Sequence, residues 1–268
     1  MIFNAFDQLP LWEVYGIILI ILFLSAELGF YVGGFRKSKI KDAGGEDKQT
    51  GSIMGASLGL LAFLLAFSFN IASNIHTERK ALVLEEANAI GTLYLRSQIF
   101  NVEEAAKLRE LLKAYVSLRV DVVSGISNEE FAEGMAVSEE KLNKIWNLVL
   151  EILRQSDGPM GTGPLINAAN EVIDLHSERV NAGFKRLPHV NSFLLMFIAV
   201  LTLTLMGYQS GLNGIRVLVP RTALILSLAT VMIVIADLDR PGGSLIDVSQ
   251  KAMVDLEKQL VVSEVNQE

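Results

Sequence analysis

Four long apolar blocks constrain the fold of this chain more than any other feature of its sequence. They cover residues 11–32, 53–75, 190–208 and 217–236. Each block is close to the ~20 residues with which a helix crosses the ~30 Å hydrocarbon layer of a membrane. Because backbone groups in that layer must form their hydrogen bonds within the segment, the blocks are expected to be helices. The sequence therefore predicts an all-α membrane protein with four transmembrane helices.

The alternative, that these blocks are buried core helices of a soluble protein, fits the composition poorly. Hydrophobic residues make up 51% of the chain and its mean hydropathy is +0.39, which leaves too little polar sequence to cover four such helices. Pro220 and Arg221 fit the fourth block if they lie in its first turn. The first ten residues contain no Lys or Arg and the next apolar block is long, so no cleavable signal peptide is expected.

Residues 77–188 lie between the second and third blocks and are predicted to form an extramembrane domain. The helix of the second span is expected to continue out of the membrane to about Ser97. Apolar residues at spacings of three and four then predict helices over residues 102–123, 127–154 and 165–187. Short connections favour an antiparallel bundle. The fold prediction is thus four transmembrane helices with a helical-bundle extramembrane domain inserted between spans two and three.

The end of the chain, residues 244–262, predicts an amphipathic C-terminal helix. Its apolar side carries four residues at near-helical spacing: Ile246, Met253, Leu256 and Leu260. Its polar side is not basic, so packing on protein is favoured over lying on an anionic membrane surface.

Positive charges near the spans bear on the orientation of the chain. The loop after the first span and the loop before the fourth are basic, with Arg36, Lys37, Lys39, Lys41, Lys48 and Arg216. Positive charge favours the cytoplasmic side, so the helical domain and both termini are predicted to lie on the outer side of the membrane. Basic residues on the domain side oppose this orientation and leave it open: Arg79, Lys80, Arg179, Lys185 and Arg186.

The second span has the most informative pattern. Small residues recur every four positions at Gly51, Gly55 and Gly59, which predicts close packing of another helix. An apolar stripe follows at the same spacing: Phe63, Phe67 and Ile71. Polar residues then occur at Ser68, Asn70 and Asn74.

Several copies around an axis would turn this stripe into stacked apolar rings. Such a hydrophobic constriction can gate a pore by dewetting, and Ser68, Asn70 and Asn74 would form its polar lining. The alternative is that the phenylalanines face lipid or pack against another helix.

Charged residues in or near the spans are further candidates. Glu27 is an intramembrane carboxylate, which is costly unless it reaches the interface, a partner helix or a functional site. Two polar clusters follow the second and fourth spans on the same side of the membrane, formed by Glu85, Glu86, Asn88, Asp237, Asp239 and Arg240. They could bind a cation through oxygen ligands, or form structural ion pairs with Arg79, Arg96 or Arg240. In an oligomer, a ring of Glu85 or Glu86 would favour cations.

Other functional classes find little support. The net charge of −7 offers no basic footprint for nucleic acid. The chain has no cysteine, which excludes disulfides and thiol chemistry, and no catalytic motif is recognisable. His76 and His176 lie near acidic residues, and only a specific fold would make them a metal site or a proton relay. We therefore expect no enzyme activity, no cofactor and no bound metal.

Three segments resemble a family of bacterial membrane proteins called bestrophin-like. They are LGLLAFLLAFSFNIASNIHTERKALVLEEANAIGTLYLRS, NEVIDLHSERV and DLDRPGGSLI, and the resemblance extends over about residues 50–260. The family is more distantly similar to the bestrophins, which are homopentameric ion channels. The resemblance implies a pentamer that conducts small inorganic ions across a lipid bilayer. It also implies that the second span lines the pore, with Phe63, Phe67 and Ile71 as its three apolar positions.

Two departures from bestrophins affect this interpretation. Bestrophins have their helical domain and termini in the cytoplasm, against the loop charges of this chain. Their acidic calcium-binding run has no counterpart after the fourth span, so calcium gating is not carried over. The leading hypothesis is a homo-oligomeric channel with a hydrophobic constriction in the second span. The alternative is a non-conducting membrane sensor or scaffold whose helical domain binds a ligand or a protein.

Overall fold

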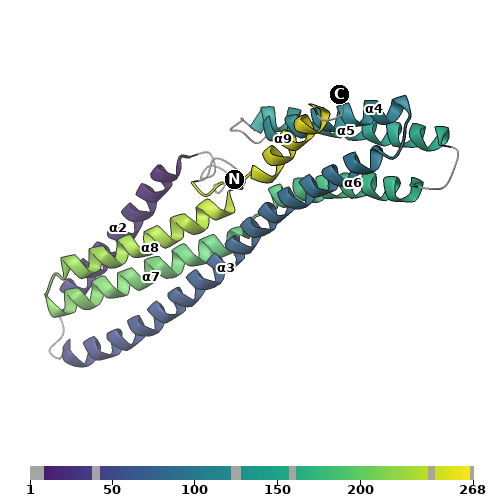
Figure 1. The fold of residues 1–268 in the computed structure, drawn as a ribbon. Helices are drawn as coiled ribbons and strands as arrows, with labels where there is room; N and C mark the ends of the chain where they lie inside the picture. The colour runs from purple at the N-terminus through teal and green to yellow at the C-terminus, as the bar shows by residue number, and fades with distance from the viewer. Residues whose placement is uncertain (1–8, 38–42, 122–127, 157–160, 241–244, 266–268) are drawn as a thin grey trace. The chain divides into compact units, whose positions relative to one another are not determined.

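A computed structural model describes residues 9–37, 43–121, 128–156, 161–240 and 245–265. Within these residues the chain forms eight helices and no strand (Figure 1). In chain order they are α2 (Leu11–Lys37), α3 (Ala43–Ser97), α4 (Glu103–Asp121), α5 (Asn128–Gln155), α6 (Thr162–Phe184), α7 (His189–Asn213), α8 (Leu218–Asp239) and α9 (Lys251–Val265).

Four of these helices, α2, α3, α7 and α8, contain stretches that are long and apolar enough to cross a membrane. The predicted all-α membrane fold with four spans is thereby confirmed. Helix α3 also continues to Ser97, as expected. It carries no charged residue from Gln49 to Ile75 and six between His76 and Arg96, so only its first part suits the hydrocarbon layer.

The chain divides into two compact units. The first, here called the apolar unit, contains α2, α7, α8 and α3 as far as Ile75. The second, the polar unit, contains α3 from His76 onward together with α4, α5, α6 and α9. Each unit has its own core of buried apolar side chains.

In the apolar unit, α2 and α7 run parallel and meet through interlocking glycines. A Cβ atom on Gly29 would overlap the backbone of Thr204, and one on Gly207 would overlap the backbone of Ala26. Gly33 and Gly211 meet the facing helix in the same way. Small residues allow such backbone contact between helices in a membrane. The predicted glycine contacts were in the second span, so sequence reasoning missed this interface.

The polar unit has a core to which α3, α4, α5, α6 and α9 all contribute. Its largest fully buried side chains are Tyr115, Ile90, Leu93, Leu108, Leu112, Ile145, Ile152 and Leu165. Met253, Leu256 and Leu260 of α9 belong to the same core, so the C-terminal helix packs on protein, as predicted. It begins at Lys251 rather than at residue 244.

Two arginines of α3 hold the ends of α6. Arg79 is buried, and its guanidinium donates to the carbonyl oxygens of Ala182 (3.0 Å) and Lys185 (2.6 Å). These carbonyls belong to the end of α6, where the last turn leaves acceptors unsatisfied. Arg96 donates to the carbonyl oxygen of Pro164 at the start of α6 (2.7 Å). Helix α6 therefore runs antiparallel to α3, and both arginines have structural roles.

Candidate functional site

The part of α3 within the apolar unit has one buried and one exposed face. Leu61, Leu65 and Ala72 pack into the core of that unit. The exposed face is formed by residues that recur at the helical period: Ser52, Ala56, Gly59, Phe63, Phe67, Asn70 and Asn74. Only 17% of the most apolar window of α3 is buried, against 33% for α2 and α8. This apolar helix is thus the one least covered by its own chain.

The exposed face changes character along its length. Phe63 and Phe67 are 66% and 53% exposed, and their rings stack with centroids 6.3 Å apart. One turn further on, the side-chain amide of Asn74 donates to the amide oxygen of Asn70 (3.1 Å). An aromatic pair is therefore followed by a pair of amides that hydrogen-bond to each other and remain exposed.

Two residues predicted for this surface lie elsewhere. Ser68 is 2% exposed and faces the buried side of α3, so it does not share the exposed face with Asn70 and Asn74. Ile71 is half-buried and packs against the core of the apolar unit. The reason is geometric: a four-residue step advances about 40° beyond a full helical turn, so Ile71 is about 80° from Phe63.

The glycines of the second span also differ from one another. A Cβ on Gly51 would lie 3.0 Å from the side-chain amide of Gln209 in α7. At Gly55 and Gly59, a Cβ would meet nothing within 4 Å. Close helix packing at Gly55 and Gly59 therefore has no partner among the described residues of one chain, and it stays a prediction for contacts between copies.

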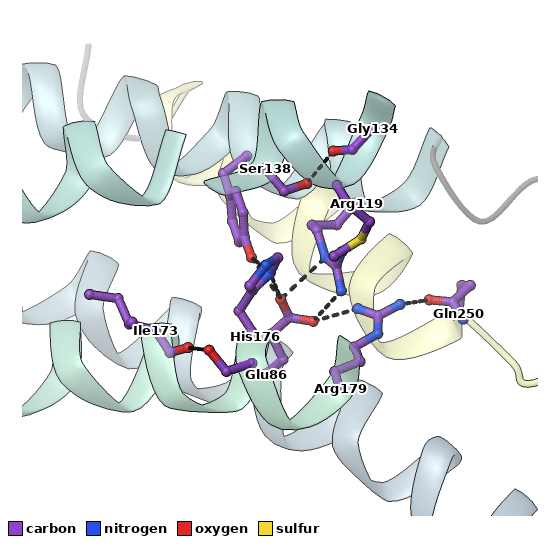
Figure 2. Close-up of polar contacts among 11 residues, drawn as sticks. Glu86, Arg119, Gly134, Ser138, Ile173, His176, Arg179 and Gln250 are labelled. Carbon is purple, nitrogen blue, oxygen red and sulfur yellow. Dashed lines mark hydrogen bonds and ion pairs between the residues drawn. The ribbon is translucent and has the colours of Figure 1, made fainter. Parts of the chain in front are cut away.

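A second site is a buried polar cluster in the polar unit, centred on Glu86 of α3 (Figure 2). Glu86 is fully buried. Its carboxylate accepts hydrogen bonds from Arg119 of α4 (3.3 Å) and from Arg179 of α6. It also accepts one from the hydroxyl of Tyr115 (2.8 Å). Burial acts to raise the pKa of Glu86, but Arg119 and Arg179 outweigh it and lower that pKa below its ordinary value.

His176 of α6 completes this cluster. Its Nδ1 lies 2.9 Å from the Tyr115 hydroxyl, whereas its buried Nε2 has no hydrogen-bond partner among the described residues. Burial, helped by the Arg119 charge, lowers the pKa of His176 to about 4. His176 is therefore neutral at pH 7, and the cluster holds two guanidinium cations against one carboxylate.

The remaining groups in the cluster extend it to other elements. Arg179 also donates to the side chain of Gln250, just before α9 (2.6 Å), and Arg119 contacts the sulfur of Met135 in α5 (3.6 Å). The expected partners of Glu86 were Arg79, Arg96 or Arg240, and the structure gives Arg119 and Arg179 instead. The sequence does contain one indication of this cluster: His176 and Arg179 are three residues apart, which places both on one side of α6.

The other predicted polar residues have separate environments. Glu85 and Asn88 are exposed on α3, and Glu85 lines a shallow groove with Asn167, Asn170, Glu171, Asp174, Leu175 and Glu178. No group of three or more described acidic or histidine side chains is arranged to hold a metal ion.

The acidic residues at the end of α8 hold nearby backbone in the apolar unit. Asp237 is buried and accepts the backbone N–H groups of Leu245 (2.9 Å) and Ile246 (3.0 Å). Asp239 accepts the N–H of Leu187 (2.5 Å) and pairs with Arg186. The backbone N–H of Arg240 bonds to the carbonyl of Asp237 where α8 ends.

Glu27 also has partners within the apolar unit. It accepts a hydrogen bond from Arg221 of α8 and lies 3.6 Å from Arg216. The Arg216 guanidinium stacks over the ring of Phe30, with its central carbon 4.5 Å from the ring centroid.

Comparison with known protein families identifies the family of this chain. A model of the bestrophin-like domain matches residues 21–253. The chain belongs to the bestrophin-like family. No curated protein matches the sequence significantly.

Solved structures show the fold of this bestrophin-like chain independently. A point variant of a bacterial bestrophin homolog from Klebsiella pneumoniae aligns with a TM-score of 0.66 over 91% of this chain and 98% of that one, at 15% identity. The same homolog, phased with zinc, aligns with a TM-score of 0.65 over 91% and 97%, at 16% identity. These matches extend over almost the whole of both chains, so they include residues of both units.

Proposed function

We propose that this bestrophin-like chain forms a homo-oligomeric ion channel in a bacterial inner membrane, with α3 lining the pore. The carrying observation is the exposed face of α3 in the apolar unit, which its own chain leaves uncovered. A single chain with four spans offers no enclosed path, so the pore requires several copies, and we propose a pentamer by resemblance to bestrophins.

Within this pore, Phe63 and Phe67 form the constriction. Both rings are exposed and stacked along the helix, so copies around an axis give two aromatic rings, one above the other. An apolar constriction of this kind closes to ions by expelling water. Asn70 and Asn74 form the polar lining after the constriction, and Ile71 flanks it rather than filling its axis.

In such an oligomer, exposed carboxylates on α3 would favour cations. Glu86 is buried and neutralised by two arginines, so it is removed from any pore mouth. Glu85 remains exposed on α3. A ring of Glu85 carboxylates would concentrate cations and repel anions.

The test is ion flux through liposomes that contain the purified protein. We compare the native chain with Phe63→Ala/Phe67→Ala. The matched control is Phe193→Ala/Phe197→Ala, because this pair on α7 is also exposed and stacked, with centroids 6.1 Å apart. The proposal expects the α3 double variant to raise the flux or change its selectivity, and the α7 double variant to leave both unchanged.

Two results would count against the pore. Equal effects of the two double variants would mean that both pairs only face lipid. Absence of flux in the native chain, tested with several cations and anions, would favour the alternative of a non-conducting sensor or scaffold.

A further inference from the structure

One end of the apolar unit concentrates positive charge where α2 and α7 finish and α8 begins. Arg36 and Lys37 lie in the last turn of α2, and Arg216 and Arg221 lie in or next to the first turn of α8. Glu27 forms ion pairs with two of these cations, Arg216 and Arg221.

Glu27 forms its hydrogen bond with one of these cations, Arg221. Arg221 is buried, with 7% of its side chain exposed, and it donates directly to the Glu27 carboxylate. Arg216 is 3.6 Å from the other carboxylate oxygen, too far for a good hydrogen bond, and its side chain is 46% exposed. The carboxylate therefore hydrogen-bonds to Arg221, whereas its longer ion pair with Arg216 leaves that guanidinium partly exposed.

The Arg216 guanidinium is held by an aromatic ring. It lies over Phe30 at 4.5 Å and near Tyr31 at 5.9 Å. The face of an aromatic ring attracts a cation that lies over it. The N–H donors of the guanidinium lie in the guanidinium plane, so they point away from the stacking contact. This arrangement orients the guanidinium and leaves N–H donors available to an acceptor outside the chain.

Exposed apolar side chains surround this cation. Ile215 and Val219 are 64% and 80% exposed on the loop and the start of α8. Tyr31 and Phe35 of α2 are each 65% exposed. A soluble anion would leave these side chains in contact with water, whereas the acyl chains of a lipid would cover them.

The geometry points to a binding site for an anionic phospholipid at Arg216. The fork of N–H groups of an arginine matches two phosphate oxygens, and Lys37 adds charge nearby while it donates to the carbonyl of Asn213 (3.0 Å). The acyl chains then run along the apolar side chains of α2 and the α7–α8 loop. Free inorganic phosphate shares the headgroup chemistry but lacks the chains.

The experiment measures lipid bound to the full-length protein in neutral detergent by native mass spectrometry. Phosphatidylglycerol, phosphatidylcholine and inorganic phosphate are added in parallel to the native chain and to Arg216→Gln. The control is Lys144→Gln, since Lys144 is an exposed base of the polar unit that pairs with its neighbour Glu140. We expect phosphatidylglycerol to bind the native chain and the control equally, and Arg216→Gln about tenfold more weakly.

Arg216→Lys separates charge from geometry and serves as the second variant should Arg216→Gln fold poorly. It retains the charge but loses the fork, so binding between the native and Gln levels is expected. Equal phosphatidylglycerol binding by native, Gln and Lys proteins would overturn the site. Equal binding of phosphatidylcholine would overturn the preference for anionic lipid, and full competition by inorganic phosphate would show a soluble-anion site instead. None of these outcomes depends on ion conduction.

Discussion

The Tyr115 hydroxyl has one proton and donates it to the Glu86 carboxylate, so the contact between Tyr115 and His176 must be donated by the Nδ1–H of His176. The histidine is thereby fixed in one neutral tautomer, with its Nε2 lone pair buried and without a partner among the described residues. Protonation of that nitrogen would place a third cation beside Arg119 and Arg179.

The first prediction concerns the pH dependence of stability. Because the pKa of His176 is about 4 in the folded chain and near 6.5 when unfolded, the unfolded state binds the proton more readily. The contribution of His176 to the free energy of unfolding is therefore fully present above pH 6.5, and it is lost as the pH is lowered from 6.5 towards 4. A shift of this size corresponds to about 3 kcal/mol. The measurement is denaturant unfolding followed by Trp146 fluorescence in a Trp12→Phe background.

His176→Asn is the informative variant for this prediction. Its amide can take over the Nδ1–H donor but does not titrate, so the slope between pH 4.5 and 6.5 should become shallower than in the native chain. The lowered pKa of Glu86 adds a separate loss of stability that begins only as the pH falls below about 4.5. An unchanged slope in His176→Asn would show that other groups cause the pH dependence.

The second prediction compares two adjacent glutamates. Glu86→Gln leaves Arg119 and Arg179 buried without their counter-charge, which should cost about 3–5 kcal/mol of unfolding free energy. Glu85→Gln changes an exposed side chain one residue away and should cost less than about 0.5 kcal/mol. Chemical denaturation of both variants checks this, and similar losses would mean that the buried ion pairs do not hold the polar unit.

The third prediction concerns the glycines between α2 and α7. Gly207→Ala forces a Cβ into the backbone of Ala26, so the two helices must separate and the Tm in detergent should fall by several degrees. Gly16→Ala is the control, since a Cβ there meets nothing within 4 Å. In a helix that change should be neutral or slightly stabilising.

The fourth prediction tests the glycines of the second span as contacts between copies. Gly55→Ala and Gly59→Ala have free space within one chain, so neither should lower the stability of a monomer. If another copy packs there, the double variant should shift the oligomer towards smaller species in light scattering coupled to size-exclusion chromatography. An unchanged oligomer mass would show that these glycines do not form contacts between copies.

The fifth prediction concerns the side of the membrane on which the polar unit lies. The chain has no cysteine, so Lys144→Cys on the exposed surface of α5 would be the sole thiol. The loop charges predict a periplasmic unit, and a membrane-impermeant maleimide should then label this thiol in intact spheroplasts. Labelling only after lysis would place the unit in the cytoplasm, as in bestrophins.

Apolar patterning predicted the helices well because crossing a membrane requires long, uninterrupted runs. Gly91 is the one helix breaker between Ile75 and Ser97 in the sequence, so a continuous α3 could be predicted. The start of α9 was missed because Asp237 takes the N–H groups of Leu245 and Ile246, a tertiary contact that periodicity does not report.

The candidate site was predicted less completely, for identifiable reasons. The four-residue spacing of Phe63, Phe67 and Ile71 suggests a single face, but a helix of 3.6 residues per turn rotates the third position off that face. The partners of Glu86 come from α4 and α6, which are distant in sequence. The spacings between Gly29 and Gly33 and between Gly207 and Gly211 were visible, but which helices meet is decided by packing.

The interlocked glycines of α2 and α7 have a mechanical consequence for the proposed channel. Two helices in backbone contact cannot roll or slide past each other without first separating, so we expect this pair to move as one rigid body. Helix α3 meets the apolar core through side chains such as Leu61 and Leu65, which can change rotamer. A change in the width of the proposed pore would then come from tilting of α3 relative to the fixed α2–α7 pair. That pair would limit how far α3 can tilt.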